Sequence, residues 1–369
     1  MRIGIVTSSL ADTDGWGRYS FEIVYELRNY GKVKVICHKT EEVDGVESHP
    51  ILPSPLSSPP KLMWYLPKMV KHLKDCEVIH CLVEPYAPLV ALLNIFFRKP
   101  FFITAHGTYA VQPLSCLVGG RFLRFAYKRA DRILCVSKYT ENRIKNATNI
   151  KHTCVIPNGV NYERFVKDPD ISHLKAEFGP GKIILSVGAL KPRKGYDVML
   201  KAFRMVRDEI ANVKYLIIGD GSWQHDLYHL AKQLKIEKDV YFLGTKSGDE
   251  LIQYYHLCDI YAHTPVNIND EFEGFGIVYL EAGACGKPVV ASDSGGVSDA
   301  VLDGVTGLLV PEKDAEATAK ALKRVLTDGK LAEQLGANGR KRAKELSWDN
   351  IVEKIIEVYE EVLSGTKSR

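Results

Sequence analysis

The sequence predicts an α/β protein made of two doubly wound parallel sheets in tandem. Short strand-like apolar runs alternate with helix-like segments along the chain, which is typical of open parallel sheets. The alternation pauses near a Gly-Pro-Gly turn at 179–181 and then restarts. The length of 369 residues exceeds the roughly 250–300 at which a single core stops growing, so two domains are expected.

Each half of the chain offers six strand patterns, separated by helix patterns such as 19–30, which ends at Gly31. The turn cluster 157–160 divides the halves. Ligands of such sheets bind in a cleft facing the carboxyl ends of the strands. The predicted strands are Ile3–Thr7, Val33–Cys37, Val78–Cys81, Phe101–Thr104, Arg132–Val136 and Thr153–Ile156, then Ile183–Val187, Tyr215–Ile218, Val240–Leu243, Ile260–His263, Val289–Ser292 and Gly307–Val310.

Composition favours a globular enzyme of the cytoplasm. The hydrophobic content of 46% and the charged content of 25% are ordinary for a globular protein. Met1-Arg2 leads straight into a strand pattern, so no signal peptide is expected, and the longest apolar run, 87–97, is too short to span a membrane. The eight cysteines show no C-x-x-C pair and no zinc spacing with histidine, which indicates buried free thiols in a reducing compartment.

Charge is distributed unevenly between the halves. Residues 1–160 hold 21 Lys/Arg against 13 Asp/Glu, a net +8, and the remainder holds 28 against 32, a net −4. A basic first half favours an anionic partner, such as a phospholipid surface, a polyprenyl-phosphate acceptor or an acidic glycan. An ordinary solvated surface is the alternative. Nucleic acid is not expected, because no nucleic-acid-binding motif accompanies the charge.

The most informative segment is the acidic glycine-rich stretch 270–276. Gly274 and Gly276 let backbone approach a ligand closely, and a helix is predicted directly behind them, over 277–285. The free N–H groups at the start of that helix can bind a phosphate. Glu273 lies at the helix mouth and Glu281 just over a turn further in. A diphosphate on amides with two acids nearby indicates a nucleotide sugar as ligand.

This segment also carries a family resemblance. Glu273-x7-Glu281 within EGFG, followed by GKPVVAS at 286–292 and by Gly295-Gly296, resembles the signature of the family 4 retaining glycosyltransferases of GT-B fold. The resemblance covers nearly the whole chain. It implies two Rossmann-like domains facing a central cleft: an acceptor-side domain over 1–160 completed by the C-terminal helix 348–369, and a nucleotide-sugar domain over 161–347.

The resemblance also implies roles for the segment. Glu281 would bind the ribose diol and Glu273 would orient sugar hydroxyls, while amides around Gly274, Phe275 and Gly276 would hold the diphosphate. Retention in this family is attributed to attack on the front face, with the leaving phosphate helping to deprotonate the acceptor. The acceptor implied is a glycan, a polyprenyl phosphate, a lipid or another hydroxyl compound, and the donor is UDP- or GDP-linked.

A first glycine-rich turn, Gly15-x-Gly17, nearly matches a dinucleotide fingerprint. The long connection from the strand ending at Thr7 and the absence of an acid after the second strand argue against a dinucleotide. The resemblance instead assigns Gly15, Gly17 and Arg18 to the donor phosphates or the acceptor. A purely structural strand-to-helix turn is the alternative.

A basic turn follows the first strand of the second half. Fixed cations beside a leaving diphosphate stabilise the transition state more than the ground state. Family members place an arginine directly after the glycine of this strand end, where this chain has Ala189. Lys194 keeps the family's position, and Arg193 is expected to supply the missing guanidinium. A solvated basic turn is the alternative.

His106 follows a predicted strand and precedes Gly107, a place where α/β enzymes bind ligands. In the resembled family a histidine here approaches the donor sugar or the acceptor. A packed or surface histidine is the alternative.

Two segments of the basic half, 61–74 and 119–129, mix aromatic and apolar residues with Lys and Arg. Either could lie on an anionic bilayer at the cytoplasmic face of the membrane. Amphipathic helices that pack on their own sheet are the alternative.

No D-x-D-like metal motif is present in a matching context, so neither a metal nor another cofactor is expected. Two other functions stay open. One is a non-catalytic relative that binds nucleotide sugar and scaffolds a glycan pathway, and the other is a sugar-nucleotide epimerase of similar fold.

Overall fold

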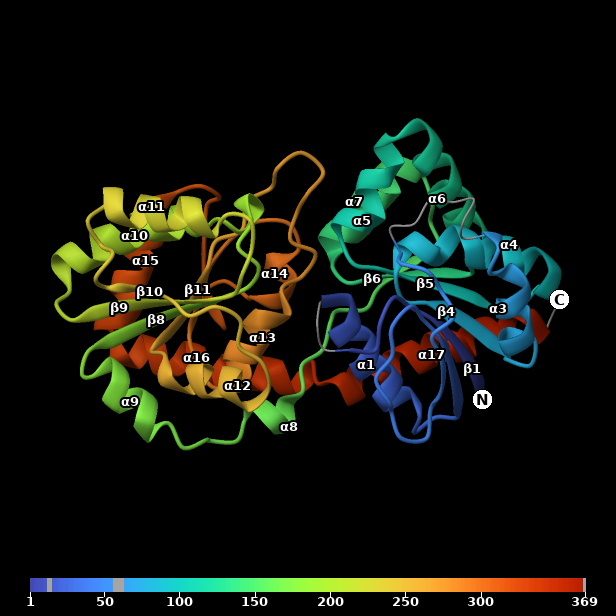
Figure 1. Ribbon diagram of the computed structural model, residues 1–369, viewed down its shortest axis with the longest axis horizontal. Coiled ribbons are helices and arrows are strands. Elements are labelled where there is room, and N and C mark those ends of the chain that lie inside the picture. The colour runs from blue at the N-terminus through green and yellow to red at the C-terminus, as the bar shows by residue number, and fades with distance from the viewer. Residues whose placement is uncertain (12–14, 56–62, 368–369) are drawn as a thin grey trace. The chain divides into compact units, whose positions relative to one another are not determined.

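The structure, a computed structural model, describes residues 1–11, 15–55 and 63–367. The chain folds into two compact units (Figure 1). Unit 1 holds Met1–Asn158 together with the last helix, α17 (Trp348–Lys367), and unit 2 holds Gly159–Ser347. The chain passes from unit 1 to unit 2 inside the turn cluster 157–160.

Seven parallel strands form the sheet of unit 1, in the order β3-β2-β1-β4-β5-β6-β7. A parallel sheet covered on both faces has strands buried along their whole length, and every residue of β4 and β5 is buried. The strands are β1 (Arg2–Val6), β2 (Lys32–Ile36), β3 (Glu47–His49), β4 (Val78–Cys81), β5 (Phe101–Ala105), β6 (Arg132–Cys135) and β7 (Thr153–Val155).

The helices of unit 1 bury apolar faces against this sheet and one another. α1 packs on α17, and α4 packs on α6. Tyr359 of α17 contacts Phe102 of β5, with ring centroids 4.6 Å apart, and its hydroxyl bonds Nδ1 of His80 at 2.5 Å, so the last helix completes this core. The described helices are α1 (Gly15–Leu27), α3 (Leu66–Leu73), η1 (Glu84–Tyr86), α4 (Ala87–Phe97), α5 (Thr108–Val111), η2 (Gln112–Ser115), α6 (Leu117–Arg129) and α7 (Lys138–Thr148).

Six parallel strands form the sheet of unit 2, in the order β10-β9-β8-β11-β12-β13. The register pairs Ile184 of β8 with Tyr215 on one side and with Ile260 on the other. The strands are β8 (Lys182–Val187), β9 (Val213–Ile218), β10 (Val240–Phe242), β11 (Ile260–His263), β12 (Val289–Ser292) and β13 (Gly307–Val310).

Helices cover both faces of this second sheet, with α10, α11 and α15 on one face and α12, α13 and α16 on the other (Figure 1). The core between α10, α15 and the sheet includes Phe203, Tyr215 and Leu322, all fully buried. The helices are α8 (Tyr162–Phe165), α9 (Ser172–Phe178), η3 (Pro192–Lys194), α10 (Tyr196–Glu209), α11 (Gln224–Gln233), α12 (Gly248–Leu257), α13 (Ile277–Ala284), α14 (Val297–Ala300), α15 (Ala315–Thr327) and α16 (Gly329–Glu345).

Each sheet has one point where the strand order reverses. It lies between β1 and β4 in unit 1 and between β8 and β11 in unit 2. Connections that leave such neighbouring strands in opposite directions open a crevice at their carboxyl ends, where α/β proteins bind ligands. The segments after β1, β4, β8 and β11 are therefore the places to seek a site.

The predicted fold class is confirmed, with two differences of detail. All twelve predicted strands exist, but β3 was missed because Glu47–His49 is short and polar. Of the eight free thiols, Cys116 is exposed and Cys154 is half-buried, so the expectation of uniform burial was wrong for these two. Among the described residues, no helix is both long and apolar enough to cross a membrane.

Candidate functional site

The acidic glycine-rich segment lies at the carboxyl edge of the unit 2 sheet. Phe275 is 1% exposed and anchors the segment in the core. Gly276 caps α13 with φ +89°, where a side chain would clash with the Tyr279 ring. The helix ends as predicted, because Gly286 adopts φ +71° and Lys287 N–H donates to the Ala282 carbonyl in a Schellman arrangement.

Glu273, Lys194 and Arg193 form one ionic cluster in front of this helix. Lys194 Nζ lies 2.5 Å from Glu273 Oε2, and Arg193 Nη1 lies 3.3 Å from the same oxygen. The three side chains are 12%, 14% and 23% exposed, respectively. Solvent therefore screens these charges only weakly. Lys194 and Glu273 are 79 positions apart in the sequence, and the structure brings them together.

The charges of the cluster are fixed by its members. Burial alone would raise the pKa of Glu273, but Lys194 and Arg193 outweigh burial and lower that pKa to about 2. The pKa of Lys194 is lowered by burial, with Glu273 opposing that shift. Because one carboxylate faces two cations, the cluster carries a net charge near +1, which favours an anionic ligand.

Close backbone packing holds the cations in place. A Cβ on Gly195, which has φ +66°, would lie 1.8 Å from the carbonyl oxygen of Thr264, so only glycine lets the η3 turn sit against the segment after β11. Val266 N–H donates to the Arg193 carbonyl, and Thr264 Oγ1 donates to the Gly195 carbonyl. These bonds join the segments that follow β8 and β11, the two strands at the reversal point.

The carboxylate is positioned from the opposite side by the Gly295-Gly296 turn. Gly296 N–H donates to the Glu273 carbonyl at 2.8 Å, and a Cβ on Gly295 would lie 2.4 Å from the same oxygen. The Gly295-Gly296 turn therefore packs on the backbone of Glu273.

Glu281 lies deeper, on α13, and is 2% exposed. Its Oε2 accepts a hydrogen bond of 2.6 Å from the hydroxyl of Tyr255 on α12. This bond fixes the carboxylate orientation, and the sequence pattern gave no sign of Tyr255.

His263, which ends β11, is a second residue that the sequence analysis missed. It is 1% exposed, and neither ring nitrogen has a hydrogen-bond partner among the described residues. Burial, and after it Lys194, lowers the pKa of His263 to about 3, so the imidazole is neutral beside the cluster. Its ring packs edge-on against Tyr196, and no motif marks such a residue in the sequence.

In unit 1 the structure brings the Gly15-x-Gly17 turn and His106 together. Both glycines lie in the first turn of α1. Gly15 is exposed with open space around it, whereas a Cβ on Gly17 would lie 2.0 Å from the Ala11 carbonyl, so Gly17 is required by packing. Tyr19 of the same helix packs edge-on against His106, with ring centroids 4.5 Å apart. Arg18 lies in the same turn and is half-buried.

His106 is held by two bonds from the segment after β4. Its Nε2 donates to the Leu82 carbonyl at 2.7 Å, and its backbone N–H donates to Glu84 Oε1 at 2.6 Å. The first bond leaves Nδ1 as the acceptor nitrogen of a neutral ring. Burial lowers the pKa of His106 to about 4, so this tautomer holds at neutral pH.

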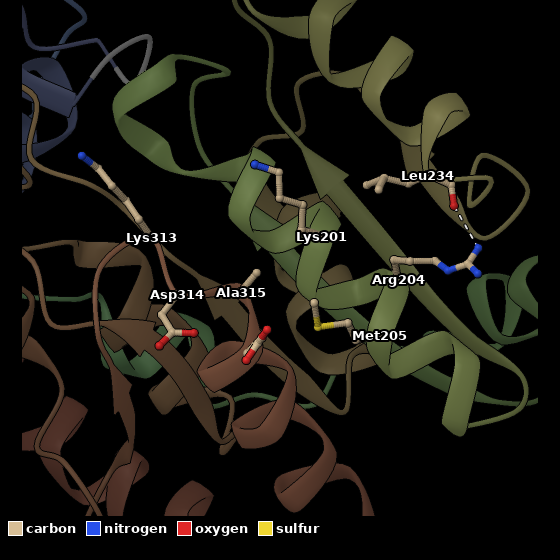
Figure 2. A pocket seen from close by; sticks show the side chains of 8 residues that line it. Lys201, Arg204, Met205, Leu234, Lys313, Asp314 and Ala315 are labelled. Atoms are coloured by element: carbon tan, nitrogen blue, oxygen red, sulfur yellow. Dashed lines mark hydrogen bonds between the residues drawn. The ribbon is translucent and has the colours of Figure 1, made fainter.

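A pocket of about 580 Å³ elsewhere in unit 2 holds none of the predicted site residues (Figure 2). It lies between α10 and the start of α15, and Arg204 of α10 donates a hydrogen bond to the Leu234 carbonyl at the end of α11. It shares no residue with the ionic cluster and is therefore not the candidate site.

Comparison with known proteins bears on both units. A sequence profile described as glycosyl transferases group 1 matches residues 169–342, and one described as glycosyltransferase family 4 matches residues 13–164. An uncharacterized glycosyltransferase of Methanocaldococcus jannaschii is 30% identical over 303 residues, which cover 80% of this chain and 79% of the relative.

A GDP-mannose-dependent alpha-(1-6)-phosphatidylinositol monomannoside mannosyltransferase of Mycolicibacterium smegmatis is 34% identical over 221 residues, 57% of each chain. Among solved structures, Anabaena HepE in complex with UDP and glucose superposes with a TM-score of 0.82 at 22% identity, covering 98% of this chain and 99% of that one. Sucrose-phosphate synthase of Thermosynechococcus elongatus gives 0.80 at 23% identity, covering 99% and 100%.

Proposed function

The chain belongs to the group 1, family 4 glycosyltransferases of GT-B fold, and on that premise we propose that it moves a sugar from a UDP- or GDP-linked donor to a hydroxyl acceptor with retention of anomeric configuration. The observation that carries the proposal is the buried cluster in which Lys194 and Arg193 share the carboxylate of Glu273. A cluster with net positive charge near the N-terminus of α13 can bind the phosphates of a nucleoside diphosphate.

The leaving diphosphate is the group that this cluster stabilises. When the bond between the anomeric carbon and the phosphate oxygen breaks, that oxygen gains negative charge. Lys194 and Arg193 lie in a poorly screened setting and are already oriented, so they favour this developing charge without reorganisation. Family members carry an arginine where this chain has Ala189. Arg193 takes its place in the proposed reaction, because its Nη1 lies 3.3 Å from Glu273 in the same cluster.

The acceptor hydroxyl attacks the same face of the sugar that the phosphate leaves. Its oxygen bonds to the anomeric carbon, and its proton passes to the departing phosphate oxygen. Glu273 binds hydroxyls of the transferred sugar, which orients the anomeric carbon. His106, a neutral ring with Nδ1 as acceptor, takes a hydrogen bond from a hydroxyl of the sugar or the acceptor.

The nucleotide is held by α13 and its neighbours. Glu281 binds the ribose diol, oriented by the Tyr255 hydroxyl. Amides of Gly274, Phe275 and Gly276 hold the diphosphate. We propose that the side-chain cations Lys194 and Arg193 stabilise the diphosphate without a metal ion, and we expect EDTA to leave the transfer rate unchanged.

We further propose an acceptor of glycan, polyprenyl-phosphate or lipid type, reached at the cytoplasmic face of an anionic membrane. α6 supports this, because Leu117 is 86% and Val118 is 66% exposed at its start while Lys128 and Arg129 are exposed at its end. Its other face is buried against unit 1, as the packing alternative expected. In the other segment predicted to contact a membrane, 61–74, Trp64 is 82% exposed, and residues 61 and 62 lie outside the described residues.

A liposome assay tests the membrane contact. We expect the wild type to float with anionic vesicles at low salt and to be released at high salt. The double variant Leu117→Ser with Val118→Ser should bind the vesicles at least tenfold more weakly than the wild type. The variant Tyr228→Ser, at an exposed aromatic residue of unit 2, should bind them as the wild type does. A protein that ignores anionic vesicles contradicts the proposed localisation.

The transfer itself is tested by incubating the enzyme with UDP- and GDP-sugars and a set of polyprenyl-phosphate, phosphatidylinositol and glycan acceptors. Proton NMR of the product should show the anomeric configuration of the donor. An inverted product contradicts retention, and conversion of the donor without any acceptor would point to an epimerase.

A further inference from the structure

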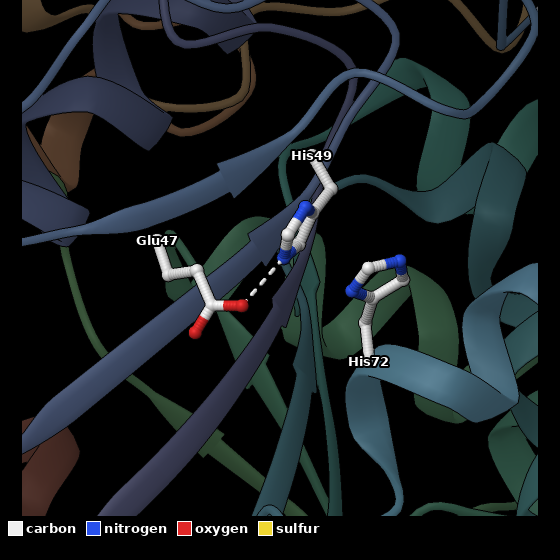
Figure 3. A group of neighbouring side chains, drawn as sticks. All are labelled: Glu47, His49 and His72. Atoms are coloured by element: carbon white, nitrogen blue, oxygen red, sulfur yellow. Dashed lines mark hydrogen bonds and ion pairs between the residues drawn. The ribbon is translucent and has the colours of Figure 1, made fainter.

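Three side chains of unit 1, two from a strand and one from a helix, bring metal-ligating atoms together (Figure 3). Glu47, His49 and His72 each offer one ligand atom, and these atoms all lie within 4.8 Å of one another. Nothing in the proposed transfer reaction uses these residues.

Two regular elements position the three residues. Glu47 and His49 lie on β3, the edge strand of the sheet, and residues two apart on a strand point to the same face. His72 lies in the last turn of α3 and points toward them (Figure 3). Sites on strands and helices are held more tightly than sites on loops. The cluster therefore has a defined geometry.

Two of the ligand atoms already contact each other. His49 Nε2 lies 2.9 Å from Glu47 Oε1. The two imidazole rings stack with centroids 3.7 Å apart and planes tilted by 36°. On the far side, Lys34 Nζ lies 3.4 Å from Glu47 Oε2 and orients the carboxylate, as outer partners of metal-binding carboxylates do.

We propose that Glu47, His49 and His72 form a binding site for a divalent transition-metal ion, with Zn²⁺ the best fit. Two imidazoles and one carboxylate are a ligand set that zinc uses in proteins, with water in the fourth position. Calcium and magnesium are poor candidates, because they prefer oxygen ligands throughout. Glu47 is exposed, so the ion can enter from solvent and keep a bound water.

Binding requires a small rearrangement. The lone pairs of imidazole lie in the ring plane, so stacked rings must turn apart for both nitrogens to face one ion. Lys34 places a positive charge near the site, which weakens cation binding. We therefore expect a dissociation constant in the micromolar range rather than that of a closed structural zinc site.

The ion would clamp α3 to the edge strand of the sheet. Two of its ligands, His49 and His72, lie 23 residues apart along the chain. The segment between them includes residues 56–62, which lie outside the described residues. An ion that binds only the folded arrangement stabilises it. This clamp is separate from the donor cluster of Lys194, Arg193 and Glu273, whose residues all lie in unit 2.

The test is a titration of chelator-stripped full-length protein with ZnCl₂, measured against a chromophoric zinc indicator. We expect one equivalent with micromolar affinity in the wild type, and at least tenfold weaker binding in the double variant His49→Ala with His72→Ala. The matched control is His225→Ala with His229→Ala, an exposed histidine pair on α11 whose Nε2 atoms lie 3.0 Å apart. This control should keep the equivalent.

A second measurement separates loss of ligands from loss of fold. Zn²⁺ should raise the melting temperature of the wild type and of the α11 control, but not that of the His49/His72 variant, whose circular dichroism should match the wild type. Substitution of cobalt should give the visible absorption of a four-coordinate ion. Absence of saturable binding below 100 μM, or loss of the equivalent in the α11 variant alone, overturns the proposal.

Discussion

Replacing Lys194 by alanine is the perturbation that separates structural from catalytic roles of the donor cluster. The variant removes the 2.5 Å bond to Glu273 and leaves Arg193, 3.3 Å away, as the carboxylate's remaining cation in the cluster. Breaking a buried ion pair lowers the free energy of unfolding by about 3–5 kcal/mol. Because Arg193 retains part of the interaction, we expect the free energy of unfolding to fall by about 1–3 kcal/mol.

The effect on activity arises separately from this loss of stability. Without the ammonium, charge on the leaving diphosphate is less well stabilised, and kcat should fall at least tenfold, on the order of 1.4 kcal/mol in barrier. Transfer rates at saturating donor and melting curves of the same samples measure the two effects. Lys191→Ala, an exposed lysine of the same loop, is the control and should change stability by less than about 0.5 kcal/mol.

A double variant, Lys194→Met with Glu273→Gln, tests the reasoning further. Removing both charges should recover part of the lost stability, because only the partly exposed guanidinium of Arg193 is then left without its carboxylate, while transfer stays low. A Lys194→Ala enzyme with wild-type kcat would refute the catalytic role, and one that is as stable as wild type would refute the buried pair.

Three further predictions concern named groups. The pKa of Glu273 near 2, against an ordinary 4.5, means that the wild type should lose about 3 kcal/mol as pH falls from 4.5 to 2, whereas Glu273→Gln should lose less over that range in urea unfolding. Glu84, 1% exposed and with Oε2 unpartnered among the described residues, has its pKa raised to about 7 by burial. Its raised pKa means that wild-type stability is lost as pH rises from 4.5 through 7, so Glu84→Gln should gain up to about 3 kcal/mol over wild type at pH 8 and almost nothing at pH 4.5; an equal difference at both values would contradict the assignment. Tyr255→Phe removes the hydroxyl that orients Glu281 and should weaken nucleotide binding by about 1.5–3 kcal/mol, measured by calorimetry, and an unchanged affinity would remove Glu281 from the ribose site.

The sequence predicted most of this architecture, because its signals are local. A buried parallel strand is a short apolar run, as β11 and β12 show, and Gly286 marks the end of α13 in the sequence as it does in the structure. The short edge strand β3 was missed because Glu47–His49 has neither apolar content nor alternation.

The residues of the candidate site likewise differ in whether a local sequence signal marks them. Glu273 and Lys194 carry motif signals, so their meeting could be predicted from family resemblance. Tyr255 and His263 carry none, because a tyrosine within a helix and a histidine at the end of a buried strand read as ordinary core residues. Their contacts with Glu281 and with the ring of Tyr196 depend on tertiary packing, which spacing along the chain does not encode.

The most direct test of the central claim is nucleotide binding by the donor cluster. Purified protein is titrated with UDP, GDP, ADP and dTDP in EDTA, with the melting temperature as the readout, for wild type, Lys194→Ala and Lys191→Ala. A ligand at about 100 times its dissociation constant adds roughly 2.7 kcal/mol of stability, which moves the transition by degrees. We predict that UDP or GDP stabilises the wild type and the Lys191 variant, and that the Lys194 variant responds only at tenfold or more higher concentration. An equal response in all three proteins, or none to any nucleotide at millimolar concentration, would contradict a diphosphate site built on Lys194, Arg193 and Glu273.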